Sequence, residues 1–207
     1  MKKMLIPVVV LISTILLTAC NVEDPDLLEP IEPPHETQAD YQSEDNENVG
    51  ELTTLAPGDW TVGVDLPAGR YVFTGTGIGI IRVSRGSINP VSENFGGIMG
   101  VSSVTTYLID GDEIEISGIR NATFTPVIDR ELSNQLSAGD WTVGLDIEPG
   151  RYNVTAPDGS GNFSVRRGNE TITNEILNQT QHIIRVQLED GDTIWIGGLN
   201  TVDFTPR

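Results

Sequence analysis

The sequence predicts an all-β fold made of two tandem copies of one small unit, and three observations lead to this prediction. Residues 58–71 and 139–152 are identical at ten of fourteen positions, at an offset of 81 residues. Apolar and polar residues alternate, as in Trp60, Val62 and Val64, which is the pattern of half-buried strands. Gly and Pro account for 34 of the 207 residues, so turns are frequent.

Residues 1–19 are typical of an export signal peptide. Lys2 and Lys3 form a short basic start, and the segment from Leu5 to Leu17 is almost wholly apolar. As a helix, these thirteen residues would rise about 20 Å, which is shorter than the roughly 30 Å hydrocarbon core of a bilayer. We therefore interpret the segment as a signal peptide rather than as a permanent membrane span.

The signal peptide ends in Leu17-Thr18-Ala19-Cys20, and Cys20 is the only cysteine of the chain. This segment resembles the lipobox of bacterial lipoproteins, in which an aliphatic residue and two small residues precede an obligatory cysteine. The resemblance implies cleavage before Cys20 and attachment of a diacylglycerol to its thiol, which would anchor the protein stably on the outer face of the cytoplasmic membrane. The alternative is an ordinary signal peptide with Cys20 close to the cleavage point.

Residues 20–56 begin with Cys20, and the rest of this segment is strongly acidic. Residues 21–56 contain eleven Asp and Glu and no Lys or Arg. Their apolar content is too low to form a core, so we predict a disordered tether with a span of about 30–35 Å as a flexible coil. The tether would hold the folded part away from an anionic membrane surface, or it is a solvated leader without a specific role.

The two copies are predicted at residues 57–127 and 138–207. The segments Asp110-Gly111-Asp112 and Asp190-Gly191-Asp192 match at an offset of 80, and Asp-Gly between alternating runs predicts a hairpin turn. We expect about seven short strands per copy, arranged as a small β-sandwich or jelly-roll-like unit. A unit of about 70 residues is only marginally stable alone, so the alternative is that both copies merge into one larger sandwich.

The copies share a pattern of Val-Gly-x-Asp-aliphatic-x-x-Gly-Arg-Tyr or close variants, followed later by Asp-Gly-Asp-x-Ile-x-Ile and Phe-Thr-Pro. This pattern resembles repeats of secreted and lipid-anchored proteins of Gram-positive bacteria, and the resemblance covers residues 57–207. It implies a β fold and an extracytoplasmic location. It supplies no catalytic residue that could be transferred to this chain.

Composition excludes several classes of function. The formal net charge is −18, which argues against nucleic-acid binding, because such proteins neutralise phosphates with Lys and Arg. A single Cys and two His leave no basis for a cysteine zinc site or a histidine-centred relay. The sequence also lacks the usual nucleophile, phosphate-binding and dinucleotide-binding motifs, so we expect no enzyme and no cofactor.

Trp195 is the most distinctive candidate for ligand contact. Its counterpart in the first copy is Glu115, which alternates with the apolar Ile114 and Ile116. We therefore expect Trp195 to point away from the core of its own copy, where its ring could stack on a sugar. The alternative is that it covers the contact between the copies or packs under a loop.

Charged residues supply further candidates. Arg166, Arg167 and Arg185 form the only local basic density and could contact an anionic wall polymer, or they balance nearby acids. Two pairs of aspartates are weak candidates for calcium ligands, although turn chemistry explains them better; they are Asp110, Asp112, Asp190 and Asp192.

Two structural pairings are also expected within the copies. Arg70 should face outward and pair with Asp65, and Arg151 should pair in the same way with Asp146. Trp60 and Trp141 recur at equivalent positions, and we assign them to the two cores.

The sequence thus predicts a lipid-anchored extracytoplasmic module that binds or scaffolds a protein or a cell-envelope polymer without catalysis. A carbohydrate-binding module that uses Trp195 is the first alternative. A small hydrolase with a carboxylate pair is the second, because such a pair need not be close in sequence.

Overall fold

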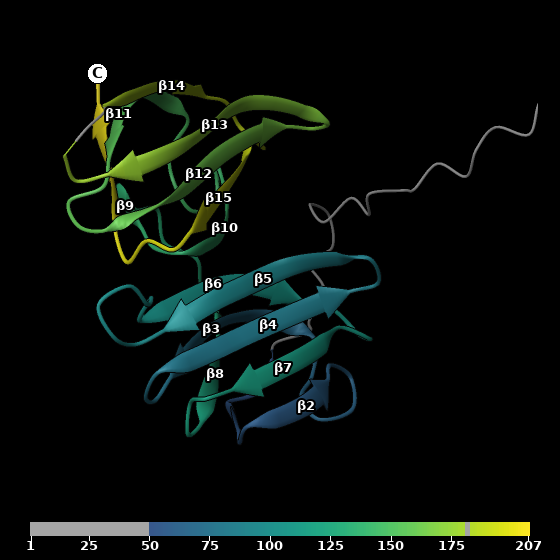
Figure 1. Cartoon of the computed structure of the whole chain (residues 1–207). Coiled ribbons are helices and arrows are strands. Elements are labelled where there is room, and N and C mark those ends of the chain that lie inside the picture. Colours follow the sequence, from purple (N-terminus) through teal and green to yellow (C-terminus); the bar gives the residue numbers. More distant parts are fainter. Residues whose placement is uncertain (1–49, 181–182) are drawn as a thin grey trace, which may run out of the picture. The chain divides into compact units, whose positions relative to one another are not determined.

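The computed structural model describes residues 50–180 and 183–207. Sixteen β-strands run through these residues, and no helix occurs among them, so the predicted all-β class is confirmed (Figure 1). The segment predicted as a signal peptide, Cys20 and most of the predicted tether lie outside the described residues.

The first eight strands form repeat 1, a sandwich of two four-stranded sheets with the orders β1-β8-β3-β6 and β2-β7-β4-β5. All pairs of neighbouring strands within these sheets are antiparallel. The strands are β1 (Thr53–Leu55), β2 (Gly58–Thr61), β3 (Gly69–Gly75), β4 (Gly79–Arg85), β5 (Ile88–Phe95), β6 (Ser103–Leu108), β7 (Glu113–Ser117) and β8 (Ala122–Pro126).

The last eight strands form repeat 2, which has the same topology. Its sheets have the orders β9-β16-β11-β14 and β10-β15-β12-β13, so each strand corresponds to the strand eight places earlier. The strands are β9 (Gln135–Leu136), β10 (Gly139–Thr142), β11 (Gly150–Thr155), β12 (Ser160–Arg167), β13 (Glu170–Asn178), β14 (Ile184–Leu188), β15 (Thr193–Gly197) and β16 (Val202–Pro206).

Each repeat has eight strands rather than the expected seven, because a short strand precedes the segment where the copies were predicted to begin. In repeat 1 this strand is β1, which pairs with β8 and buries Leu55; in repeat 2 it is β9, which pairs with β16 and buries Leu136. The repeats therefore start before residues 57 and 138. Leu55 and Leu136 are 81 residues apart, so the repeat offset itself carried this signal.

Two separate hydrophobic cores occupy the two sandwiches. The core of repeat 1 contains Tyr71 and Phe124, whose rings meet edge to face at 6.2 Å between centroids. The equivalent pair in repeat 2, Tyr152 and Phe204, meets in the same way at 5.9 Å. Edge-to-face contact of this kind is a favourable geometry for aromatic rings. The copies are thus tandem sandwiches, each with its own core.

One sheet nevertheless passes from repeat 1 into repeat 2. The edge strand β6 lies parallel to β10, with Thr105 opposite Gly139, and this contact joins two four-stranded sheets into one of eight strands. The Thr105 N–H donates a hydrogen bond of 3.0 Å to the Ala138 carbonyl. Gly139 has a φ of +135° here, and an added Cβ would overlap the Thr105 carbonyl oxygen, so this approach requires glycine.

The two recurring tryptophans lie at the margins of the cores and are only partly buried. Trp60 packs against the core of repeat 1 and Trp141 against that of repeat 2. Each indole N–H donates to a carbonyl four residues earlier, that of Ala56 at 3.0 Å or Ser137 at 2.8 Å. The rings cover the cores while their polar N–H groups remain satisfied.

Candidate functional site: a cavity beside Trp195

Trp195 points away from the core of repeat 2, as the alternation on its strand predicts. Its neighbours Ile194 and Ile196 are completely buried, whereas 38% of the Trp195 surface is exposed. In the sheet register, Trp195 lies between Asp140 of β10 and Ser164 of β12. An aromatic ring and two polar side chains therefore share the outer face of this sheet.

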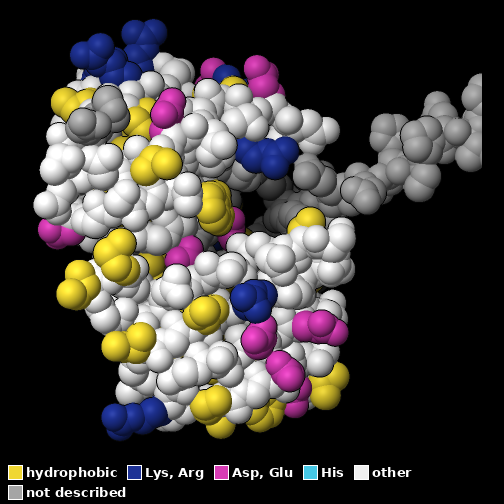
Figure 2. Space-filling view, in the orientation of Figure 1, with side chains coloured by type: hydrophobic (Ala, Val, Ile, Leu, Met, Phe, Trp, Pro, Cys, Tyr) yellow, Lys and Arg dark blue, Asp and Glu magenta, His cyan; other side chains and the backbone are white. Residues whose placement is uncertain are grey.

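A cavity of about 300 Å³ opens on this face. Figure 2 shows the surface hollowed between the two repeats. Three lining residues come from the start of β5 in repeat 1, and the others come from β10, β12 and β15 of repeat 2. The cavity therefore depends on the packing of one repeat against the other; its lining residues are Ile88, Asn89, Pro90, Asp140, Ser164, Arg166, Thr193, Ile194 and Trp195.

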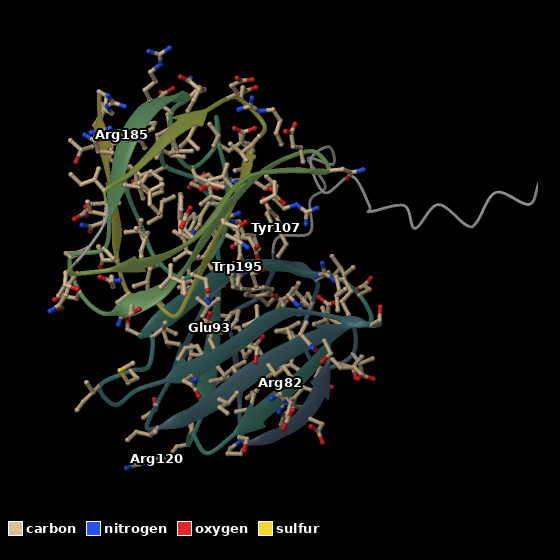
Figure 3. All side chains as sticks on the ribbon, turned by 45° about the horizontal axis from the view of Figure 1, so that its top comes forward. Arg82, Glu93, Tyr107, Arg120, Arg185 and Trp195 are labelled. Carbon is tan, nitrogen blue, oxygen red and sulfur yellow. The ribbon has the colours of Figure 1, made fainter. Side chains whose placement is uncertain are left out.

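The Trp195 ring is supported by backbone on one side. A Cβ added to Gly197 would lie 2.8 Å from the Trp195 ring and 3.2 Å from Oε1 of Glu93, so ring and carboxylate both approach this glycine. Figure 3 labels Trp195 and Glu93. The Gly198 N–H donates to both carboxylate oxygens of Glu93 at 3.1 Å. Burial raises the pKa of Glu93, and this hydrogen bond partly opposes the rise. Glu93 of repeat 1 thus holds the β15–β16 turn of repeat 2.

Asp140 supplies the carboxyl group of the cavity. Thr106 of repeat 1 donates a hydrogen bond of 2.6 Å to its Oδ2. Burial raises the pKa of Asp140, while the Thr106 hydrogen bond and the positive charge of Arg70 act in the opposite direction. Among the described residues that line the cavity, Asp140 is the only carboxyl group.

The lining combines an apolar ring with hydrogen-bonding groups of both kinds. Trp195 offers a flat surface, Arg166 offers donors, and Asp140 offers an acceptor. Ser164, Thr193 and Asn89 add hydroxyl and amide groups. A concave site with an aromatic surface and a few convergent polar groups suits a small polyhydroxylated ligand or a short segment of a polymer.

The three arginines of the predicted basic density have different surroundings. Arg166 lines the cavity and is exposed. Arg167 instead donates to both carboxylate oxygens of Asp192, at 2.8 and 2.9 Å, and also pairs with Glu189. Arg185 lies on β14, in the other sheet of repeat 2, and faces solvent (Figure 3). The structure brings only Arg166 into the cavity with Trp195.

The aspartates that were weak candidates for calcium ligands have structural contacts. Asp112 is almost fully buried, pairs with Arg85 at 2.7 Å and accepts the Ile109 N–H at 3.0 Å. Asp192 makes the equivalent contacts in repeat 2, with Arg167 and with the Glu189 N–H. Asp110 and Asp190 sit in the hairpin turns, each near a glycine of the preceding turn. Over residues 50–180 and 183–207, no group of three or more His, Cys, Asp or Glu could hold a metal ion.

The expected pairings of Arg70 and Arg151 are wrong. Arg70 is buried and contacts Asp146 of repeat 2 at 3.3 Å, not Asp65 of its own repeat. Asp146 also binds Arg130 of the connecting segment, so Arg151 has no access to it and donates instead to Gln187 at 2.8 Å. The reason is tertiary, because the turn that carries Asp146 packs over the β3–β6 face of repeat 1.

Sequence reasoning missed the residues that repeat 1 contributes to the site. Ile88, Asn89 and Pro90 line the cavity, and Glu93 supports it from β5. Nothing in their local pattern marks them, because their role arises from a contact with the other repeat. Asp140 could have been found, since Gly-Asp-Trp recurs in both copies at an offset of 81.

Comparison of the sequence with protein-family models and with curated proteins finds no match to either. In the described part of the chain there is also no helix with the length and apolar character needed to cross a bilayer. The functional argument therefore rests on the residues of the chain and on the cavity beside Trp195.

Proposed function

We propose that this chain is a lipid-anchored extracytoplasmic module that binds a component of the cell envelope without catalysis. The lipobox-like segment that ends at Cys20 supports the anchor and its location. The cavity beside Trp195 supports the binding role, because it is the place where an aromatic ring, an arginine and several polar groups converge. A surface protein is the other class of ligand for the same module.

The composition of the cavity favours a carbohydrate-containing polymer as the ligand. Sugar rings present apolar faces that stack on Trp, and their hydroxyl groups match Asp140, Ser164 and Thr193. Arg166 would favour a polymer that also carries negative charge. This second, narrower proposal depends on Trp195, whereas a protein-binding scaffold does not.

The same lining argues against a glycosidase. Hydrolysis of a glycosidic bond ordinarily uses two carboxyl groups about 5–10 Å apart, one on each side of the scissile bond. Asp140 is the single carboxyl among the described lining residues, and it is already engaged by Thr106. We therefore keep the non-catalytic proposal.

The binding proposal is tested by co-sedimentation of the fragment 50–207 with purified cell-wall sacculi. This fragment contains both cores and all sixteen strands. We expect the parent to sediment and Trp195→Ala to bind about ten- to thirtyfold more weakly, which is the usual effect of removing a central aromatic contact. Val64→Ala, which shortens an exposed apolar side chain that does not line the cavity, should bind as the parent does.

Equal binding by the parent and by Trp195→Ala would contradict the carbohydrate proposal. It would mean that the chain binds the wall through residues other than Trp195. Failure of the parent to sediment at any wall concentration would exclude wall binding and favour a surface protein as the partner.

The anchor is tested separately with the full chain. Cells fed a fatty acid that carries a chemical tag should incorporate the tag into the parent but not into Cys20→Ser. Thr18→Ser keeps a small residue in the segment and should be labelled normally. Release of an unlabelled parent into the medium would contradict the lipid anchor.

A further inference from the structure

The contact between the repeats joins two different edges: the β6 edge of repeat 1 meets the β10 edge of repeat 2. Because the repeats have the same topology, repeat 2 has its own equivalent of β6, which is β14, and repeat 1 has its own equivalent of β10, which is β2. Both β14 and β2 lie at the edge of a sheet and are far from the β6–β10 contact (Figure 1). The described chain therefore carries the strand that corresponds to each half of its internal interface on an outer surface.

Arg70 is the central charged residue of the internal interface. Its guanidinium lies 4.9 Å from the ring centroid of Tyr107 and 5.3 Å from that of Trp141. It donates to both carboxylate oxygens of Asp146 and to the Asp140 carbonyl, each at 3.3 Å. A cation on the β3–β6 face is thus held by an acidic turn and a tryptophan of the next repeat.

Arg70 and Asp146 each have an exposed counterpart in the other repeat. Arg151 occupies the place of Arg70 in repeat 2 and is exposed. Asp65 occupies the place of Asp146 in repeat 1 and is also exposed. The turn that presents it is the same, because Asp65 accepts the Thr61 N–H at 2.8 Å just as Asp146 accepts the Thr142 N–H at 2.7 Å.

A second contact of the interface is repeated in the same way. Glu93 accepts the Gly198 N–H across the internal interface. Its counterpart in repeat 2 is Glu175, which is exposed on β13. The counterpart of Gly198 in repeat 1 is Gly118, and the two glycines have similar φ values of 73° and 80°. The donor turn and the acceptor carboxylate are therefore both present on outer surfaces.

One difference between the halves adds to the charge complementarity. Thr105 of β6 is replaced by Arg185 in β14, so the outer β11–β14 face carries the two exposed arginines Arg151 and Arg185. The outer β2 end carries the exposed Asp59 and Asp65. Two cations thus stand on one surface and two carboxylates on the other, in the positions that meet inside the chain.

We propose that a second copy of this chain docks head to tail, with the β11–β14 face of one molecule on the β2 end of the next. Arg151 would take the role of Arg70, Asp65 that of Asp146, and Glu175 that of Glu93. Such a contact joins two different surfaces, so it leaves one free surface of each kind and extends beyond a dimer. This inference does not depend on the lipid anchor or on a wall ligand.

The test is sedimentation velocity of the fragment 50–207 over a range of concentrations. We expect the parent to form species larger than a dimer, in amounts that rise with concentration. Arg151→Ala and Asp65→Ala should each remain monomeric, with association weakened by more than about tenfold, because each removes one partner of a charge pair that becomes buried on docking. Asp65→Asn keeps an acceptor for the Thr61 N–H and removes only the charge. It should also remain monomeric, which would show that the effect of Asp65→Ala is not a change in the turn.

The decisive measurement is an equimolar mixture of Arg151→Ala and Asp65→Ala. One intact pair of surfaces remains in this mixture, so it should stop at a dimer of one molecule of each variant. Asp158→Ala, which changes an exposed charge on a loop outside the proposed contact, should assemble like the parent. The proposal is overturned by a parent that is monomeric at all concentrations, by single variants that still associate, or by a mixture that remains monomeric.

Discussion

Arg70 is a buried cation whose partners come from both repeats. Its guanidinium lies between the rings of Tyr107 and Trp141 and contacts Asp146, which also binds Arg130. Removal of Arg70 would therefore leave Asp146 with a positive partner. The loss of stability would come mainly from the lost packing between the two rings and from the lost link between the repeats.

Arg70→Ala is expected to destabilise the fragment 50–207 by about 2–4 kcal/mol, because it removes a long buried side chain from a filled interface. Arg151→Ala at the equivalent exposed position should change the free energy of unfolding by less than about 0.5 kcal/mol in dilute monomeric protein. Urea unfolding of both variants measures the difference. Equal effects would show that Arg70 does not join the repeats.

Asp192 makes a pH-dependent contribution to stability. Burial alone would raise its pKa, but the hydrogen bonds from Arg167 and from the Glu189 N–H hold the pKa below the usual value of 3.8. A carboxyl group with a lowered folded-state pKa stabilises the fold above its unfolded-state pKa. This stabilisation is lost as the pH falls through the folded-state pKa.

Asp192→Asn should therefore destabilise repeat 2 by about 1–3 kcal/mol at pH 7, and the difference from the parent should shrink below about pH 4. Asp158→Asn, on an exposed loop, serves as the control and should change little at either pH. Urea unfolding at pH 7 and pH 3 gives the comparison. A difference that is independent of pH would mean that the Asp192–Arg167 pair is not the source of the effect.

At the scale of elements, edge strands decide how the repeats meet. The edge strand β6 is covered by β10, whereas β2 and β14 remain at the edges of their sheets. Short edge strands and charged side chains are the usual protection of an open sheet edge against indiscriminate pairing. Asp59 on β2 and Arg185 on β14 fit this description and also give the two edges opposite charge.

Gly139→Ala tests the β6–β10 approach. An added Cβ would overlap the Thr105 carbonyl, so the two strands must separate. Gly58→Ala is the matched control, because Gly58 also has a positive φ but the nearest atom to its added Cβ is 3.7 Å away. We expect Gly139→Ala to cost about 1–3 kcal/mol more than Gly58→Ala in urea unfolding. Similar costs would indicate that φ strain alone matters.

At the scale of the whole molecule, two cores are joined by one interface. Proteins built from repeats gain stability from each repeat and from the contacts between neighbours. Here the contacts include Arg70–Asp146, Glu93–Gly198 and the β6–β10 pair, so the two sandwiches should unfold as one unit. The cavity beside Trp195 also depends on this interface, because β5 supplies part of its lining.

The fragment 50–207 should therefore show a single unfolding transition, and Arg70→Ala combined with Asp146→Ala should separate it into two. Trp60→Phe leaves tryptophans only in repeat 2, so its fluorescence follows repeat 2 while circular dichroism follows both repeats. The two signals should coincide in Trp60→Phe and diverge when the interface substitutions are added. Divergence before those substitutions would contradict coupling between the repeats.

Local pattern was enough to predict the fold class and part of the site. Alternation is a property of each strand, so the inward direction of Ile194 and Ile196 and the outward direction of Trp195 followed from the sequence. The repeat offset likewise predicted two copies, because equal sequences form equal elements. The short strands β1 and β9 were missed because two or three residues carry little periodicity.

The sequence by itself determined the all-β class, the duplication, the turns and which side of the alternating strands faces inward, since these depend on residues that are near neighbours in the chain or in one sheet. Only the tertiary structure decided that Arg70 binds Asp146 rather than Asp65, and that β5 lines a cavity on repeat 2. Both outcomes depend on how two nearly equal units pack against each other. Sequence periodicity describes which side of a strand is buried, but it contains no information on which neighbouring surface covers the other side.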